Sequence, residues 1–207
     1  MAASDNITTE AAEKIPGPNK TGEQSELEKS LFREVVETIG LAVILAIILR
    51  TFVIQAFFIP SGSMENTLLP GDMILVNKFI YYFTDYKHGD IIVFKYPKEP
   101  EKDYIKRVIG LPGDTVEIKN GDIYINDKLT EEKYTKQKAA DDIILHASAG
   151  ADVPLSKIKV PEGKLFVMGD NRNNSQDSRF WGYLPKENIR GKALLIYWPL
   201  NRIGLIR

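Results

Sequence analysis

The chain has 207 residues, 43% of them hydrophobic, which is enough for one ordinary domain plus an appendage. Its 27 basic and 28 acidic residues give a net charge of −1. This balance argues against nucleic acid as a partner, because nucleic-acid-binding domains usually carry a basic excess. The chain has no cysteine, which excludes thiol catalysis, disulfides and thiolate metal sites.

The N-terminal segment is polar. Residues 1–24 contain almost no large apolar side chains, so they cannot bury enough surface to offset the entropy of ordering, and we predict a disordered tail. Leu27, Leu31 and Val35 then recur at four-residue spacing, which indicates a helix. We assign residues 1–33 to this tail and the start of that helix.

Residues 34–56 are predicted to form one transmembrane anchor. Eleven uncharged residues from Ile39 to Leu49 form its centre, and apolar flanks bring it to the ~20 residues that a span needs. Arg50, near one end, can reach the lipid headgroups. The alternatives are a buried core helix and a cleaved signal peptide. The net-acidic stretch in front argues against the second, because signal peptides begin with a basic region near the N-terminus.

The basic residues around this segment indicate its orientation. Lys20, Lys29 and Arg33 precede it, whereas after Arg50 the next basic residue is Lys78. Since cytoplasmic flanks carry the excess of Lys and Arg, we expect the tail to stay in the cytosol and the remainder to be exported. The lipid bilayer is thus an expected partner.

The exported part, residues 57–207, is predicted to be mainly β. Val116–Ile118 and Ile123–Ile125 flank Asn120-Gly121, a strong hairpin signal. Short apolar runs with frequent Gly and Pro indicate an antiparallel β-barrel or sandwich. Residues 129–160 break the pattern, and we interpret them as a small inserted subdomain. The other predicted strands cover residues 73–76, 90–94, 104–109, 165–168 and 193–198.

Ser63 and Lys106 are the candidate catalytic pair. A serine becomes a nucleophile only if a neighbouring group takes its proton, and the two histidines, His88 and His146, are interpreted as exposed or satisfied. Lysine, with an ordinary pKa of ~10.4, becomes a base only when an apolar environment lowers that pKa. Lys106 lies in an apolar row, although strand lysines also face solvent. Ser61 could supply an oxyanion donor, although Ser-Gly-Ser is also an ordinary loop sequence.

A third segment, residues 168–182, is dense in short polar side chains that favour Asx-type turns. Its functional interpretation is a polar scaffold that holds the catalytic lysine, and its structural one is a hydrogen-bonded loop. A calcium loop fits poorly, because Arg172 and Ser175 interrupt the alternation of oxygen ligands that an EF-hand requires.

Together these segments resemble type I signal peptidase, a Ser/Lys dyad serine protease. The resemblance implies a membrane-bound endopeptidase that removes signal peptides from exported preproteins after small residues at positions −3 and −1. It also implies a single-pass protein of a bacterial-type plasma (inner) membrane. No cofactor, metal or obligate protein partner is expected. The blocks that carry it are the anchor, Pro60–Met64, Gly71–Lys78, Tyr104–Asp114 and Gly169–Gly182.

The resemblance also implies a role for individual residues. Ser63 would be the nucleophile and Lys106 the general base. The Ser61 hydroxyl would join the oxyanion hole, and Ser175 would hydrogen-bond and orient the lysine. Residues expected to brace or shape the site are Arg107, Gly169, Asp170, Asp177 and Arg179. Residues expected to form shallow substrate pockets are Phe57, Ile59, Tyr104 and Ile105.

One position departs from the family pattern, and two other functions compete. Asn66 stands where the family usually has a proline, so the loop loses a fixed φ. A self-cleaving Ser/Lys peptidase of the SOS-repressor kind would need a DNA-binding module in place of residues 1–56. A catalytically silent, membrane-anchored β-domain is the alternative from another class, and the presence of every motif residue argues against it.

Overall fold

The structure, a computed structural model, describes residues 20–48, 50, 53–138 and 157–206. It divides into two compact units, Met1–Ala46 and Ile47–Arg207. We describe each unit by itself. His146 and residues 139–156 of the predicted insertion lie outside the described residues.

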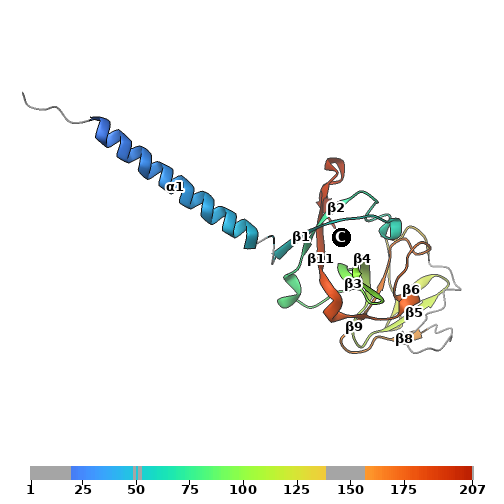
Figure 1. Ribbon diagram of the computed structural model, residues 1–207. Coiled ribbons are helices and arrows are strands. Elements are labelled where there is room, and N and C mark those ends of the chain that lie inside the picture. Colours follow the sequence, from blue (N-terminus) through green and yellow to red (C-terminus); the bar gives the residue numbers. More distant parts are fainter. Residues whose placement is uncertain (1–19, 49, 51–52, 139–156, 207) are drawn as a thin grey trace, which may run out of the picture. The chain divides into compact units, whose positions relative to one another are not determined.

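The described part of the first unit is helical (Figure 1). Helix α1 spans Lys20–Ile48 and confirms the helix indicated by the leucine spacing. It begins inside the predicted tail because a formed helix adds residues at little cost, and the Lys, Glu and Gln found there are tolerated in helices. Within the described ranges, no helix is both long and apolar enough to cross a membrane. The anchor therefore stays a prediction, and residues 49, 51 and 52 of it lie outside the description.

Antiparallel strands dominate the second unit, as the sequence predicts. The larger sheet has the order β1-β2-β11-β3-β4-β9-β10, with β12 pairing to β11. All pairings in it are antiparallel, and β4 lies between β3 and β9. Its strands are β1 (Ile54–Phe58), β2 (Met73–Asn77), β3 (Ile91–Tyr96), β4 (Glu99–Gly110), β9 (Lys164–Met168), β10 (Leu184–Pro185), β11 (Ile189–Trp198) and β12 (Gly204–Leu205).

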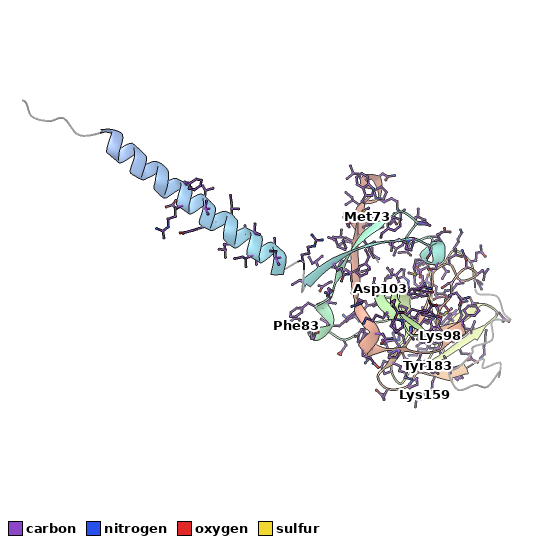
Figure 2. All side chains as sticks on the ribbon, in the orientation of Figure 1. Met73, Phe83, Lys98, Asp103, Lys159 and Tyr183 are labelled. Atoms are coloured by element: carbon purple, nitrogen blue, oxygen red, sulfur yellow. The ribbon has the colours of Figure 1, made fainter. Side chains whose placement is uncertain are left out.

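A smaller sheet follows the order β7-β6-β5-β8 and lies beyond β9 in Figure 1. The predicted hairpin is confirmed, because Asn120 and Gly121 both have positive φ, 50° and 74°, as a two-residue turn of this kind requires. The Tyr183 hydroxyl donates to the Lys159 carbonyl, and Figure 2 shows these two residues side by side. The strands are β5 (Thr115–Lys119), β6 (Asp122–Ile125), β7 (Lys128–Leu129) and β8 (Lys157–Lys159).

The remaining elements are single turns of helix. They are η2 (Gly62–Met64), η3 (Ile80–Tyr82), α2 (Ser178–Trp181), η4 (Lys186–Asn188) and η5 (Leu200–Arg202).

The core of the second unit consists of three apolar clusters, and β4 contributes to all of them. Ile105, Val108 and Ile109 each belong to a different cluster. From Ile105 to Gly110 every residue of β4 is buried. Polar side chains in this stretch are therefore held in an apolar environment, and two of them are Lys106 and Arg107.

Candidate active site

Ser63 lies in η2, in the connection between β1 and β2. The neighbouring Met64 and Leu68 are fully buried and anchor this connection in a core cluster. Ile59 pins its start, donating its N–H to the Asp72 carbonyl and accepting from the Gly71 N–H, both at 2.9 Å. Ser63 itself is 9% exposed. Its hydroxyl is thus presented from a loop that packing holds in place.

Lys106 reaches this hydroxyl from β4. Its Nζ lies 2.8 Å from Ser63 Oγ and 2.8 Å from the Ile105 carbonyl, and the residue is 3% exposed. Burial lowers the pKa of Lys106 to about 8, although Asp177 and Asp170 oppose that shift. Removal from water disfavours the ammonium form, so the amine titrates near physiological pH. The sequence argument for a buried lysine base is matched by this geometry.

Two predicted residues flank the pair. Ser61 is exposed, and its hydroxyl lies 3.5 Å from Ser63 Oγ. The Tyr104 ring lies 5.4 Å from Lys106 Nζ, centroid to nitrogen, and stacks on Tyr96 with centroids 4.4 Å apart. The lysine therefore has an aromatic wall on the side of the ring and a second hydroxyl near its serine partner.

Ser175 differs from expectation in one respect. It is buried, but its hydroxyl has no hydrogen-bond partner in the described part of the chain, so the bond predicted to the Lys106 amine is not formed. Gly169 explains how Ser175 fits: a Cβ on Gly169 would overlap Ser175 Oγ and the Ser63 carbonyl oxygen. The loop approaches so closely that only glycine is accommodated, as the predicted shaping role requires.

The predicted bracing residues form two buried ion pairs. Arg107 binds Asp170 with both ends of its guanidinium, at 2.8 and 2.7 Å. Arg179 binds Asp177 in the same way, at 2.8 Å for each bond. Asp177 also accepts the Gly169 N–H at 3.0 Å, which ties this pair to the loop at the site. Bidentate geometry of this kind is what makes a buried guanidinium–carboxylate pair tolerable.

Four contributing residues were not assigned a role from the sequence. Asn171 donates its side-chain N–H to the Gly62 carbonyl at 3.0 Å, and its backbone N–H to the Ser63 carbonyl at 3.2 Å. Thr67 hydrogen-bonds Asp170, and Arg172 binds Glu132. Asn171 and Arg172 lie inside the polar segment of residues 168–182, here called the polar block, and that position was the only sign in the sequence that they contribute to the site. Thr67 and Glu132 carried none.

Ser61, Ser63, Lys106 and Ser175 line a cleft of about 490 Å³. Of the predicted pocket residues, Tyr104 and Ile105 line it. Phe57 and Ile59 do not line the cleft. Ile59 is a core residue, 2% exposed, and Phe57 is partly buried and packs against the core cluster that contains Ile59. Asp103, marked in Figure 2, lies at its β4 side. The cleft residues are Pro60–Ser63, Asp103–Lys106, Asn173–Gln176 and Phe180.

The position that departs from the family pattern faces solvent. Asn66 is exposed, and the peptide bond that joins it to Glu65 is cis. His88, the described histidine, is bound to Asp114 at 2.6 Å with its side chain 45% exposed, as a satisfied surface histidine would be.

Comparison with known proteins identifies close similarity over most of the chain. Residues 32–198 match the family described as "Signal peptidase, peptidase S26". A signal peptidase I of Leptolyngbya laminosa is 44% identical over 83% of this chain and 82% of its own length. Signal peptidase I P of Bacillus subtilis subsp. natto is 39% identical over 87% and 97%. A crystal structure of a signal peptidase I from Enterococcus faecalis V583 is 32% identical, covers 53% of this chain and 97% of its own, and gives a TM-score of 0.43.

Proposed function

This chain belongs to the signal peptidase family, peptidase S26, and is a serine endopeptidase that removes signal peptides, and we propose that Ser63 is its nucleophile and Lys106 its general base. The observation that carries this assignment is the 2.8 Å contact between Ser63 Oγ and a buried lysine amine whose pKa is lowered to about 8. A neutral amine at that distance can accept the hydroxyl proton as the oxygen attacks.

The chemical steps follow from this geometry. Ser63 Oγ attacks the carbonyl of the scissile peptide bond while Lys106 takes its proton. The resulting oxyanion is stabilised by the Ser63 backbone N–H and the Ser61 hydroxyl. The Lys106 ammonium then gives its proton to the leaving amine, which releases the mature protein and leaves an acyl-enzyme on Ser63. Lys106, neutral again, activates the water that hydrolyses the ester and returns the proton to Ser63.

Ser175 serves the charged intermediate in this scheme. Its buried hydroxyl is without a partner among the residues described, and it lines the same cleft as Lys106. An ammonium gains a hydrogen-bond donor relative to an amine, so Ser175 can accept from it when the lysine is protonated. Arg107, Asp170, Asp177 and Arg179 hold the walls, and Gly169 permits the close approach.

The substrate is proposed to bind as an extended strand beside β4. In the described chain, β9 pairs with β4 from Arg107 onward, so Tyr104 and Ile105 present a backbone edge on that side. Strand addition satisfies such an edge, and the side chains of alternate substrate residues enter pockets. Tyr104 and Ile105 leave shallow pockets that favour small residues at positions −1 and −3. Phe57 and Ile59 act behind them, because they fill the core that supports the β1 side of the cleft.

The membrane arrangement is also part of the proposal. Residues 34–53 form a single-pass anchor, which ends earlier than the predicted residue 56 because Ile54–Ala56 belong to β1 and pair with β2. Residues 1–33 lie in the cytosol, and residues 54–207 form the exported domain with an insertion near 129–160. Support comes from the eleven uncharged residues, from basic residues on one flank, and from apolar side chains such as Val35, Ile39 and Ile44, each more than half exposed on α1. Relatives from bacteria agree with a plasma (inner) membrane. The partners are preproteins and the bilayer.

The decisive experiment is cleavage of a preprotein by the purified full chain in detergent. Ser63→Ala and Lys106→Ala should each lower cleavage by at least about 10³-fold, because either change removes the activated nucleophile. Lys102→Ala is the matched control, since Lys102 lies on the same strand with its side chain 59% exposed, and it should cleave normally. Cleavage that survives both dyad substitutions would refute the assignment.

The same assay separates the alternatives. A self-cleaving peptidase of the SOS-repressor kind would cut its own chain in preference to a preprotein, and a silent β-domain would cut neither. The relatives described above are signal peptidases, so we expect a single cut in the preprotein at the end of its signal peptide.

A further inference from the structure

Residues 131–137, which follow β7 and are here called the strap, contact the active-site scaffold at several points. None of these residues lines the cleft that holds Ser63 and Lys106. The sequence suggested no role for them beyond the start of an insertion. Their contacts nevertheless reach the three segments that carry the candidate catalytic groups, so the strap is a candidate positioning element.

Glu132 neutralises a buried cation beside the site. Arg172 is 1% exposed, and its guanidinium donates to both carboxylate oxygens of Glu132, at 2.7 and 2.5 Å. The Nε of Arg172 donates to the Gly169 carbonyl at 3.0 Å. Arg107 and Arg179 obtain their carboxylates from the polar block itself, whereas Arg172 obtains its carboxylate from the strap. Without Glu132, Arg172 would be a buried charge lacking a carboxylate.

Tyr134 covers the residue that follows the proposed base. Its ring centroid lies 3.8 Å from the guanidinium carbon of Arg107, a stacking distance at which an aromatic face attracts a cation. Its hydroxyl donates to Glu132 Oε1 at 2.8 Å, so the two strap residues are coupled. Arg107 in turn holds Asp170, and it is adjacent to Lys106 on β4. Tyr134 thus restrains the Arg107–Asp170 pair from the side that the cleft does not cover.

Three further bonds fasten the strap to the loops on either side. The Lys136 backbone N–H donates to the Asp170 carbonyl at 3.2 Å, and its ammonium lies 2.6 Å from Glu65, two residues after Ser63. Gln137 accepts from the Asn173 side chain at 2.6 Å. The strap therefore joins the Ser63 loop, β4 and the polar block. Among the other described segments outside these three, none joins them through a salt bridge, an aromatic stack and a backbone hydrogen bond together.

From this network we infer that Glu132 and Tyr134 are positioning residues for the Ser63–Lys106 pair, acting through Arg172 and Arg107. The inference rests on the proposed dyad. Displacement of a reacting group by about 1 Å can cost about 10²-fold in rate, so a network that fixes both walls has a large kinetic effect without touching substrate. The loss should fall on kcat and leave KM nearly unchanged, because the strap does not line the substrate cleft.

The test uses the full-length chain and compares Tyr134→Leu with Tyr134→Phe. Leucine removes the stack on Arg107, whereas phenylalanine keeps it and loses only the bond to Glu132. We expect Tyr134→Leu to lower kcat at least about tenfold with KM within about twofold, and Tyr134→Phe to restore most of it. Lys133→Ala is the control within the strap, because Lys133 pairs only at the surface with Glu131 and should cleave normally.

The pH profile distinguishes positioning from loss of folding. Lys106 is surrounded by Asp170, Asp177, Arg179 and Arg107. In Tyr134→Leu, a loosened Arg107 would neutralise the Asp170 charge less completely and would admit water to the site. Both effects favour the ammonium form and raise the pKa of Lys106. The rising limb of kcat/KM should therefore move to higher pH. A limb that stays in place, with kcat per folded molecule unchanged, overturns the inference.

Glu132→Gln decides the question if Tyr134→Leu does not fold. It keeps the shape of the side chain and removes the charge that Arg172 needs. A lower kcat per folded molecule at constant KM supports the positioning role, and an unchanged kcat overturns it. Activity that persists in Ser63→Ala would instead refute the proposed dyad, so the two failures are distinguishable.

Discussion

At the scale of single residues, the central problem is how the pKa of Lys106 is lowered beside two carboxylates. Asp170 and Asp177 each raise its pKa, yet burial prevails and the pKa falls to about 8. Each carboxylate is bound at both oxygens by a buried guanidinium, Asp170 by Arg107 and Asp177 by Arg179. The two ion pairs therefore provide a polar, rigid wall whose net charge is close to zero. That combination lets a hydrogen-bonded site coexist with a neutral amine.

The pH dependence of cleavage should report this balance. If Lys106 acts as base in its neutral form, kcat/KM should rise about tenfold per pH unit below the pKa and level off above about 8. A solvent-exposed lysine with its ordinary pKa would place the rising limb of kcat/KM more than two pH units higher, near ~10.4. The measurement is kcat/KM for a preprotein or peptide across pH 5 to 10. A rate that is flat through pH 7 to 9 would contradict a lysine base with the lowered pKa.

The same residues show what the sequence could and could not predict. Ser63 and Lys106 were each weak signals, and their pairing came from the order of several motifs. The predicted bond between Ser175 and the lysine is absent, and the Lys106 amine instead contacts Ser63 Oγ and the Ile105 carbonyl. The partnership of Arg172 with Glu132 could not be predicted, since it joins positions 40 residues apart and only one of them lies in a recognisable motif.

At the scale of elements, the approach of the polar block to the Ser63 loop determines the site. The closest point is Gly169, which follows β9 and has no room for a side chain. Its N–H is held by Asp177 and its carbonyl by Arg172, so the backbone cannot retreat easily. The contact explains why a residue without catalytic groups belongs to the active-site motif.

Gly169→Ala should therefore damage both stability and rate. The new Cβ overlaps the Ser63 carbonyl and Ser175, and overpacking of this kind costs about 1–3 kcal/mol of unfolding free energy. We expect a lower Tm and a kcat reduced at least about tenfold, because the loop that carries Ser63 is pushed aside. Gly204→Ala is the control, since its Cβ would meet only the Arg202 carbonyl at 3.9 Å. Equal behaviour of the two variants would contradict the steric account.

Strands were predictable where they carry runs of apolar residues, alternately buried as in β2 or buried almost throughout as in β3 and β9. The runs that became β2, β3, β4, β9 and β11 were all identified, as was the β5–β6 hairpin. The missed strands include β1, whose residues Ile54–Ala56 were assigned to the anchor. Also missed were β7, β8, β10 and β12, each of two or three residues. Such short strands exist because a neighbouring strand supplies their hydrogen bonds, so their own sequence carries little signal.

At the scale of the whole molecule, the catalytic groups and their support lie in one unit. The three apolar clusters contain residues from Ile59 onward, and Ser63, Lys106 and Ser175 all lie within Ile47–Arg207. The chemistry is thus expected to depend on the second unit, and the proposed anchor to determine where that chemistry takes place.

Removal of residues 1–53 should separate these two contributions. The remaining chain retains β1 and every described cluster residue, so it should fold and cleave a soluble peptide with a kcat/KM close to that of the full chain in detergent. Preprotein embedded in lipid vesicles should be processed at least about tenfold more slowly, because the anchor confines enzyme and substrate to one surface and raises their effective concentration. The two substrates are compared for both chains at equal active-enzyme concentration. Equal processing of the vesicle-bound preprotein by the two chains would contradict an anchoring role for residues 34–53, since diffusion from solution would then serve as well as attachment.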